Sequence, residues 1–468
     1  MSGSAGGAPE IDGERLMGRL DELAQIGAIE GTQGNCRLAL TDEDRDGRDL
    51  VCTWMADLGL DITIDGLGNV VACTEAGRVA DSVMMGSHID TVATGGRYDG
   101  NLGVLAGLEV IESVLSSGRM PARPLSVGYF TDEEGSRFAP DMLGSLAYVG
   151  GMALEEALEI TDRDGIAVGD ELDRIGYRGA APVPGTVPFA FMELHIEQGP
   201  VLEFHETQIG VVEGVQGISW TEVTLRGQSN HAGTTPMPLR RDAGLAACRI
   251  ANEVRDLAHN IGDSQVGTVG AISLVPNLVN VIAGSATMTV DLRNTSEAML
   301  RHAESRLDEI VSRNAEAEHL DASMRRTARF EPVEFHPAVI DLVEQCAAEA
   351  GLTHRRMPSG AGHDAQMLAR VCPTAMIFVP SFDGVSHNPA EYTAPRDIEA
   401  GANLLADVVW RLANGEIDDE LGRAEPAGRS ETQPDAGIDL RSGGRVGGEF
   451  DGNARARADR TTDGGATT

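Results

Sequence analysis

The chain has 468 residues, more than one compact domain accommodates, so about two domains are expected. Asp and Glu number 73 and the basic residues 37, all of them Arg, so the net charge is −36. This acidity argues against nucleic acid as a partner, because phosphate contacts need clustered positive charge. There is no signal-peptide core, and no apolar run approaches the roughly 20 residues of a membrane helix. We therefore expect a cytoplasmic protein without a membrane partner.

The complete absence of lysine, combined with the high negative charge, favours a halophilic protein. Carboxylate repulsion at this charge destabilises a fold in low salt, and salt screens it. An ordinary acidic protein from a GC-rich genome is the alternative. The six cysteines include no CxxC pair, so neither a thiolate zinc site nor a redox motif is indicated.

Taken in chain order, the pattern predicts a helix from about Ile11 and then alternating strands and helices. Four short apolar runs each stop at a polar cluster: residues 82–90, 125–134, 189–195 and 374–379. Residues 102–115 carry apolar side chains at helical spacing. Strands alternating with helices indicate an α/β sheet, whose ligands bind beyond the carboxyl ends of the strands.

The stretch from about 215 to 330 differs from the rest. Residues 219–225 and 286–292 alternate as strands do, and residues 240–258 and 296–314 are helical in pattern. We therefore expect a small α+β domain inserted into a larger one. The predicted boundaries are 10–214 and 331–414 for the larger domain and 215–330 for the insertion. Residues 415–468 have almost no aliphatic side chains and are predicted to be a disordered acidic tail.

Histidine and carboxylate residues gather at the ends of the four apolar runs. They are His88 with Asp90, the triplet Asp132-Glu133-Glu134, His195, and His387 shortly after the last run. Each has an ordinary alternative: a histidine satisfied at a strand end, or a solvated acidic turn. Asp99 lies in a glycine-rich loop before a helix, where it caps the helix or bridges two metals.

The coincidence of four such strand ends outweighs the separate alternatives. Imidazole and carboxylate ligands without thiolates suit Zn, Mn, Co or Ni in a hydrolytic site. The sequence therefore predicts a metal-dependent hydrolase.

Nine motifs now indicate a family. They are GSHIDT, GGRYDGNLGVLAG, FTDEEGSRF, ELHIEQGPVLE, GQSNHAGTTPM, VPNLVNVI, DLR, SGAGHDA and SHNPAEYT. In this order, over roughly residues 10 to 412, the chain resembles the amidase/hydantoinase/carbamoylase family. That family includes N-carbamoyl-L-amino-acid hydrolases, β-ureidopropionases and allantoate amidohydrolases. The resemblance implies an α/β fold with a dimetal aminopeptidase-like catalytic domain and an inserted α+β lid that also dimerises.

The resemblance also implies roles for single residues. His88 and His195 would bind one divalent metal, Glu134 and His387 a second, and Asp99 would bridge the two. Glu133 would be the general base, with Asp90 supporting His88. Gln198 would contact the ureido group or the metal shell, and His231 would reach in from a partner subunit to stabilise the oxyanion. Asn280 and Arg293 would clamp the substrate's carboxylate.

Two of these residues keep a plainer alternative: Arg293 as a structural ion pair and His231 as a turn histidine. His363, in the SGAGHDA motif, is expected beside the ligands without being one. The expected reaction is hydrolysis of the ureido C–N bond of an N-carbamoyl-L-amino acid by a homodimer with two metals per subunit. Alternatives are an allantoate amidohydrolase, an aminoacylase or peptidase on the same metal core, and a metal-binding protein without catalysis.

Overall fold

The structure is a computed structural model that describes residues 7–262 and 264–421. Within these ranges, nine strands form one mixed sheet in the order β1-β2-β4-β3-β5-β13-β6-β11, with β12 paired to β6. The strands are β1 (Asp61–Ile64), β2 (Val70–Cys73), β3 (Val83–His88), β4 (Leu125–Phe130), β5 (Ala190–Ile196), β6 (Ile209–Val215), β11 (Val333–Glu334), β12 (His354–Ser359) and β13 (Thr374–Val379). The expected α/β fold class is confirmed.

The four predicted apolar runs form the centre of this sheet. β3 pairs in parallel with β4 and β5, and β13 pairs in parallel with β5. Every residue of these four strands is buried, as expected of a parallel sheet covered on both faces. Their carboxyl ends therefore lie along one edge.

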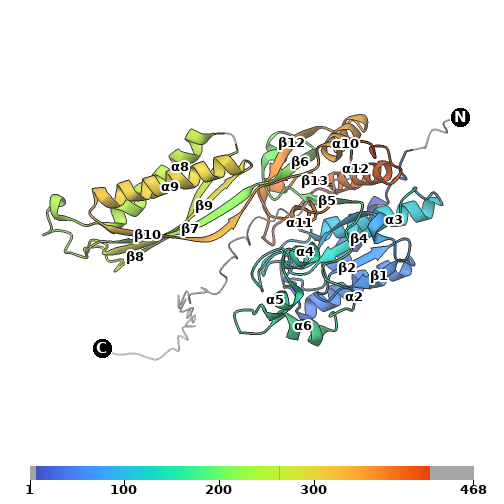
Figure 1. The fold of residues 1–468 in the computed structure, drawn as a ribbon, viewed down its shortest axis with the longest axis horizontal. Helices are drawn as coiled ribbons and strands as arrows, with labels where there is room; N and C mark the ends of the chain where they lie inside the picture. Colours follow the sequence, from blue (N-terminus) through green and yellow to red (C-terminus); the bar gives the residue numbers. More distant parts are fainter. Residues whose placement is uncertain (1–6, 263, 422–468) are drawn as a thin grey trace, which may run out of the picture. The chain divides into compact units, whose positions relative to one another are not determined.

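Helices pack against both sides of this sheet (Figure 1). The longer ones are α1 (Gly13–Leu23), α2 (Asp42–Asp57), α3 (Asn101–Ser117), α10 (Pro337–Glu349) and α12 (Pro395–Ala413). The shorter ones are α4 (Leu143–Tyr148), α5 (Leu154–Glu159), α6 (Val168–Ile175), α7 (Val201–Phe204) and α11 (Asp364–Leu368). Short 3-10 turns occur at Val79–Asp81, Met237–Leu239 and Phe382–Gly384.

A second, antiparallel sheet is built from residues between the two parts of the first. Its order is β10-β7-β9-β8, from β7 (Gly217–Arg226), β8 (Val266–Val275), β9 (Ser285–Asn294) and β10 (Asp321–Phe330). Helices α8 (Ala243–Ile261) and α9 (Glu297–Ala317) pack on each other and on this sheet. On β9, buried and less buried residues alternate, because alternate side chains face the helices.

Each sheet has its own hydrophobic core. The core of the nine-stranded sheet takes residues from Ile11 to Val215 and again from Phe335 to Leu421. The core of the four-stranded sheet takes residues from Val223 to Ala315. No helix within the described ranges is long and apolar enough to span a bilayer.

The ordered chain continues past the expected tail boundary at about residue 415. Ile417 and Leu421 are buried in the first core, and Asp418 forms an ion pair with Arg123 at 2.7 Å. The polar composition of the segment did not indicate that these two apolar side chains are buried. The rest of the predicted tail, residues 422–468, lies outside the described residues.

Candidate metal centre

The four parallel strands bring the predicted metal ligands to one edge of the sheet. His88 ends β3, Glu133 and Glu134 follow β4, and His195 is the penultimate residue of β5. His387 follows β13 after a short loop. Asp99 lies at this edge too, in the loop between β3 and α3.

Asp99 lies at the centre of the cluster, with its two carboxylate oxygens facing different histidines. Its Oδ1 is 3.2 Å from Nε2 of His195 and 3.9 Å from Nε2 of His88. Its Oδ2 is 3.4 Å from Nε2 of His387, and that nitrogen is 3.3 Å from Oε2 of Glu134. Two groups able to hold a metal ion therefore share Asp99: His88–Asp99–His195 and Asp99–Glu134–His387.

Backbone carbonyls fix the orientation of two of these imidazoles. Nδ1 of His88 is 2.9 Å from the carbonyl of Asp90, and Nδ1 of His195 is 2.8 Å from that of Ile196. Because a carbonyl only accepts hydrogen bonds, each Nδ1 carries the hydrogen. Both Nε2 atoms therefore face Asp99. The hydrogen on Nδ1 leaves the lone pair of each Nε2 available, as a metal ligand requires.

Gly100 lets the Asp99 loop approach this closely. Its φ of +65° favours glycine, and a Cβ on it would collide with the imidazole of His88. The Gly100 amide donates to Nε2 of His195 at 3.2 Å.

The electrostatics of the cluster fit cations. Burial works against ionisation of Asp99, but hydrogen bonds from His195 and His387 hold its pKa well below the usual range. Burial lowers the pKa of His88 to about 4. Against burial, the hydrogen bond with Asp99 raises the pKa of His195 to about 9, so the surroundings of this imidazole favour positive charge.

Glu133 and Glu134 experience the opposite environment. Burial raises the pKa of Glu133 well above its usual range, and the carboxylates of Asp364 and Glu134 raise it further. Burial and then Asp99 do the same to the pKa of Glu134. Oε2 of Glu133 lies 3.4 Å from Nε2 of His88. Such crowded buried acids are stabilised by bound divalent ions, so the donor set fits Zn²⁺-like metals.

Asp90 supports the site differently from the expectation. Its backbone carbonyl, rather than its carboxylate, bonds the His88 ring; the carboxylate oxygen is 3.9 Å from Nδ1. The carboxylate instead accepts hydrogen bonds from the amides of Glu133 and Glu134, each at 3.3 Å. Asp90 therefore holds the turn after β4, because both its oxygens face backbone donors.

Gln198 reaches the same cluster. Its Nε2 donates to Oδ2 of Asp99 at 3.0 Å and lies 3.4 Å from Nε2 of His387. Its Oε1 is buried without a partner among the described residues. A buried acceptor of this kind, on a side chain that contacts this cluster, suits a substrate N–H group or a metal ion.

The residues expected to bind the substrate's carboxylate, Arg293 and Asn280, and the expected oxyanion donor, His231, belong to the two ends of the second sheet. Arg293 pairs with Asp291 at 2.9 Å and donates Nη1 to the carbonyl of Gly360 at 2.6 Å. His231 and Asn280 are exposed in loops beyond the other end of β7 and β9, where the amide of Ala232 donates to the carbonyl of Asn280 at 2.9 Å.

The ladder between β7 and β9 separates these two groups. It runs from Ile218 opposite Arg293 to Arg226 opposite Ser285, eight residues further along. At about 3.4 Å per residue this is about 27 Å. Backbone bonds from Gly227 to Gly284 and from Ile282 to Asn230 continue the ladder outward. Asn280 and Arg293 of one chain therefore do not clamp the same carboxylate, contrary to the simplest form of the expectation.

Among the buried polar residues around the candidate metal ligands, some were not predicted from the sequence, and for His363 only a place near the ligands was expected. Arg37 donates to the carbonyl of Ile89 and to Asn101, joining the ends of β3 and the Asp99 loop. His363 packs edge to face against His195, with ring centroids 4.5 Å apart, consistent with a place beside the ligands. Glu391, four residues after His387, contacts the Asp99 loop. Only its spacing from His387 could have suggested it.

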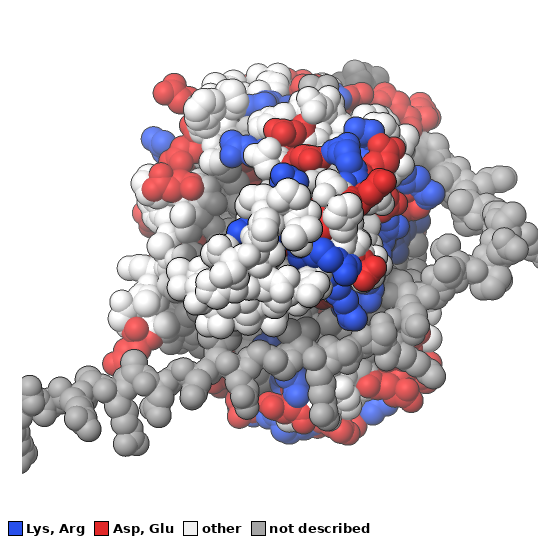
Figure 2. Space-filling model, turned by 90° about the vertical axis from the view of Figure 1, so that its left-hand side faces the viewer, with Lys and Arg blue, Asp and Glu red and all other residues white. Residues whose placement is uncertain are grey.

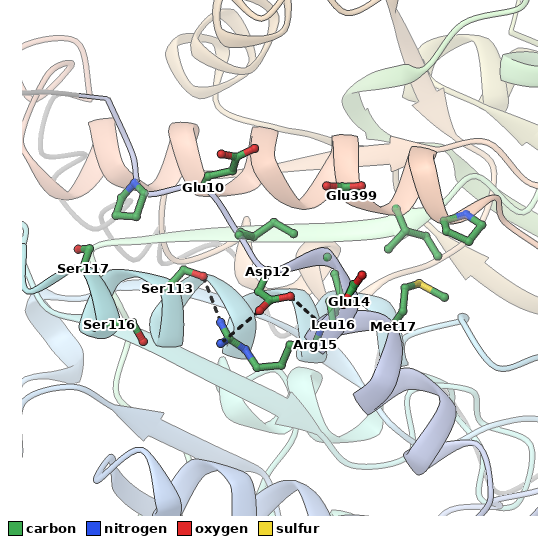
Figure 3. Close-up of a pocket in the computed structure, with 15 residues that line it drawn as sticks. Glu10, Asp12, Glu14, Arg15, Leu16, Met17, Ser113, Ser116, Ser117 and Glu399 are labelled. Carbon is green, nitrogen blue, oxygen red and sulfur yellow. Dashed lines mark hydrogen bonds and ion pairs between the residues drawn. The ribbon is translucent and has the colours of Figure 1, made fainter.

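A separate hollow of about 860 Å³ lies where α1, α3 and α12 meet (Figure 3). Glu10, Glu14 and Glu399 line it with Arg15 and the serines at the end of α3. None of the predicted site residues lines this hollow. The strand-end cluster, and not this hollow, holds the groups suited to catalysis.

Comparison with known proteins identifies the family. The model of peptidase family M20/M25/M40 matches residues 84–411, so the chain belongs to that family. An N-carbamoyl-L-amino-acid amidohydrolase from Rhizobium meliloti is 40% identical, over 86% of this chain and 97% of its own. An allantoate amidohydrolase from Bacillus subtilis is 35% identical, over 84% and 96%.

A solved structure gives the same result. An amidase of the hydantoinase/carbamoylase family from Burkholderia multivorans superposes with a TM-score of 0.84 at 45% identity, covering 87% of this chain and 99% of its own. The predicted resemblance to the amidase/hydantoinase/carbamoylase group is confirmed.

Proposed function

We propose that this chain hydrolyses the ureido C–N bond of N-carbamoyl-L-amino acids, releasing the amino acid, ammonia and carbon dioxide. The observation that carries the proposal is Asp99, whose two oxygens face two separate sets of metal ligands. The identity to N-carbamoyl-L-amino-acid amidohydrolases over most of both chains supports the choice of substrate.

The site would hold two divalent ions per chain. His88 and His195 would bind one, Glu134 and His387 the other, with Asp99 common to both. When bound, such ions supply Lewis-acid polarisation of the carbamoyl oxygen and make water acidic enough to react near neutral pH.

Glu133 is suited to move the proton in this reaction. Its carboxylate lies beside His88 yet belongs to neither ligand group, so it is free to accept a proton. Its raised pKa keeps that proton available for the leaving amine. Glu133 would therefore act as base toward the attacking water and then as acid toward the departing nitrogen.

Arg293 is suited to bind the substrate's carboxylate. Asp291 occupies one edge of its guanidinium, through Nε and Nη2, and Gly360 accepts from Nη1. The remaining hydrogens of Nη1 and Nη2 leave a second edge for a carboxylate. This explains how an acidic protein would select an acidic substrate.

The ladder of about 27 Å supports the completion of the site by a second copy of the chain. His231 and Asn280 lie at the end remote from Arg293, so a partner's lid, and not the chain's own, would bring them to the substrate. Met237, Leu239, Leu278 and Val279 expose large apolar side chains in the same two loops, up to full exposure for Val279. The left-hand side of Figure 1, where this sheet lies, faces the viewer in Figure 2 and presents a broad uncharged area. We therefore propose a homodimer.

A substrate panel tests the function. Metal-stripped protein would be reconstituted with Mn, Zn, Co or Ni and offered N-carbamoyl-L-amino acids, allantoate, N-acyl amino acids and dipeptides. We expect ammonia from the carbamoyl amino acids with the highest kcat/KM. Faster turnover of allantoate would move the substrate to the alternative seen in the Bacillus subtilis relative, and acyl or peptide cleavage alone would overturn the proposal.

A further inference from the structure

Glu391 contacts the Asp99 loop although it lies almost 300 residues further along the chain. It follows β13 in the loop that carries His387, and its side chain is only 4% exposed. Its Oε1 accepts hydrogen bonds from the amides of Tyr98 and Asp99, at 3.0 and 3.2 Å. One carboxylate oxygen thus fixes two successive backbone units at the residue shared by both metal-binding groups.

The other oxygen of Glu391 extends this contact to the Asp99 side chain. Ser386 Oγ is 3.2 Å from Oε2 of Glu391 and 3.0 Å from Oδ2 of Asp99. A hydroxyl has one hydrogen, so it donates to one of these carboxylates at a time. Ser386 precedes His387 directly, which places Glu391, Ser386 and Asp99 in one network beside a metal ligand.

The fit between the two loops is close. A Cβ on Gly96 would collide with the carboxylate of Glu391, so glycine at position 96 makes room for it. Within the described residues, no Arg or His lies within ion-pair distance of Glu391, whereas the buried Glu304 pairs with Arg329 at 2.8 Å. The hydrogen bonds of Glu391 given above all go to the Asp99 loop or the His387 loop. Such contacts are expected of a group that orients metal ligands.

We propose that Glu391 is a positioning residue that fastens the Asp99 loop to the His387 loop and so sets the geometry of the bridging carboxylate. This inference rests on the proposed two-metal function. Without the Glu391 side chain, Asp99 and His387 would no longer be held at one separation. The ion that Asp99, Glu134 and His387 would hold would then be bound more weakly.

Metal binding by the full-length protein tests this directly. Glu391→Ala, Glu391→Gln and Ser386→Ala would be stripped of metal and titrated with Zn²⁺ against a chelating indicator, and with Co²⁺ while the visible spectrum is recorded. Glu304→Ala serves as the matched control, because it also removes a buried carboxylate but lies on α9 away from the strand ends. All titrations are made at a temperature where circular dichroism shows folded protein.

We expect Glu391→Ala to weaken metal affinity about 10- to 100-fold and to alter the Co²⁺ spectrum. Glu391→Gln should restore most of the affinity, because its amide oxygen still accepts from both backbone amides. Ser386→Ala should show a smaller loss, and Glu304→Ala should bind metal as the unaltered protein does while melting at a lower temperature.

Unchanged affinity and spectrum in Glu391→Ala would overturn the proposal. If that variant does not fold, wild-type metal affinity in Ser386→Ala would overturn it equally. An unaltered chain that takes up no metal would remove the proposed two-metal site and the role of Glu391 together. Two bound metals without hydrolysis of any substrate would reject the proposed substrate and leave Glu391 in its role.

Discussion

Two buried carboxylates of the site, those of Asp99 and Glu133, have pKa values shifted in opposite directions. Asp99 faces three imidazoles, and the hydrogen bonds from His195 and His387 keep its pKa well below the usual range despite burial. Glu133 is buried among other acids, and its pKa is raised well above the usual range. Environments that separate the pKa values of paired acids support the proposed roles, cation binding for Asp99 and proton transfer for Glu133.

Glu133→Gln tests this division of roles. The amide keeps the shape of the side chain but cannot take up or release a proton near neutral pH, so we expect both metals to remain bound while proton transfer is lost. Turnover should fall about 10²- to 10⁴-fold, the usual contribution of a general acid–base group. Ammonia release and elemental analysis on the same preparation measure both quantities. Loss of metal along with activity would make Glu133 a ligand instead.

Sequence patterns could predict the residues that the strands deliver directly. His88, Glu133, Glu134 and His195 follow from the ends of apolar runs, because a buried parallel strand leaves its polar residues at its carboxyl end. Glu391 could not be predicted in the same way. Its partners are backbone amides far away in the chain, and in a protein with 73 acidic residues it resembles a surface glutamate.

At the scale of elements, the order of the strands depends on pairings that no local pattern contains. β13 lies between β5 and β6, and β12 pairs with β6 from outside that path. β8 was not predicted as a strand, because its glycines and its mostly exposed residues blur the alternation. β7 and β9 alternate clearly and were predicted nearly residue by residue.

Mixed dimers test the role of the second sheet. His231→Ala and Glu133→Gln each inactivate one contribution, so a heterodimer would contain one site with both native residues and one with neither. Because the two sites of a two-fold dimer share contributions, mixing should restore up to about half the activity in each heterodimer. Mass spectrometry counts the heterodimers, and the ammonia assay measures their turnover. Heterodimers that form without regaining activity would show that His231 acts within its own chain or not at all.

At the scale of the whole molecule, the charge of −36 without lysine predicts a dependence on salt. Carboxylate repulsion is screened over about 3 Å at 1 M salt, against about 10 Å at 0.1 M. We expect the melting temperature to rise with KCl into the molar range. Scanning calorimetry at concentrations from about 0.1 to 3 M KCl measures this melting temperature. A flat response would favour the ordinary acidic protein over the halophilic one.

The carboxyl-terminal segment divides at Leu421. Removing residues 422–468 should leave turnover and melting temperature unchanged, because their composition offers little apolar surface to bury. Truncation after residue 414 should lower stability, since Ile417 and Leu421 are buried and each such side chain contributes about 1.5–3 kcal/mol. Thermal melts of the two truncations provide the comparison. Equal melting temperatures would mean that Ile417 and Leu421 contribute nothing.

A metal titration of activity tests the central claim most directly. Stripped protein receives Mn²⁺ or Zn²⁺ in steps below and above two equivalents per chain, and ammonia release from an N-carbamoyl-L-amino acid is measured at each step. We predict that the rate rises to a plateau at two equivalents per chain, because both ligand groups sharing Asp99 must be filled. A plateau at one equivalent, or no ammonia at any metal content, would contradict the account.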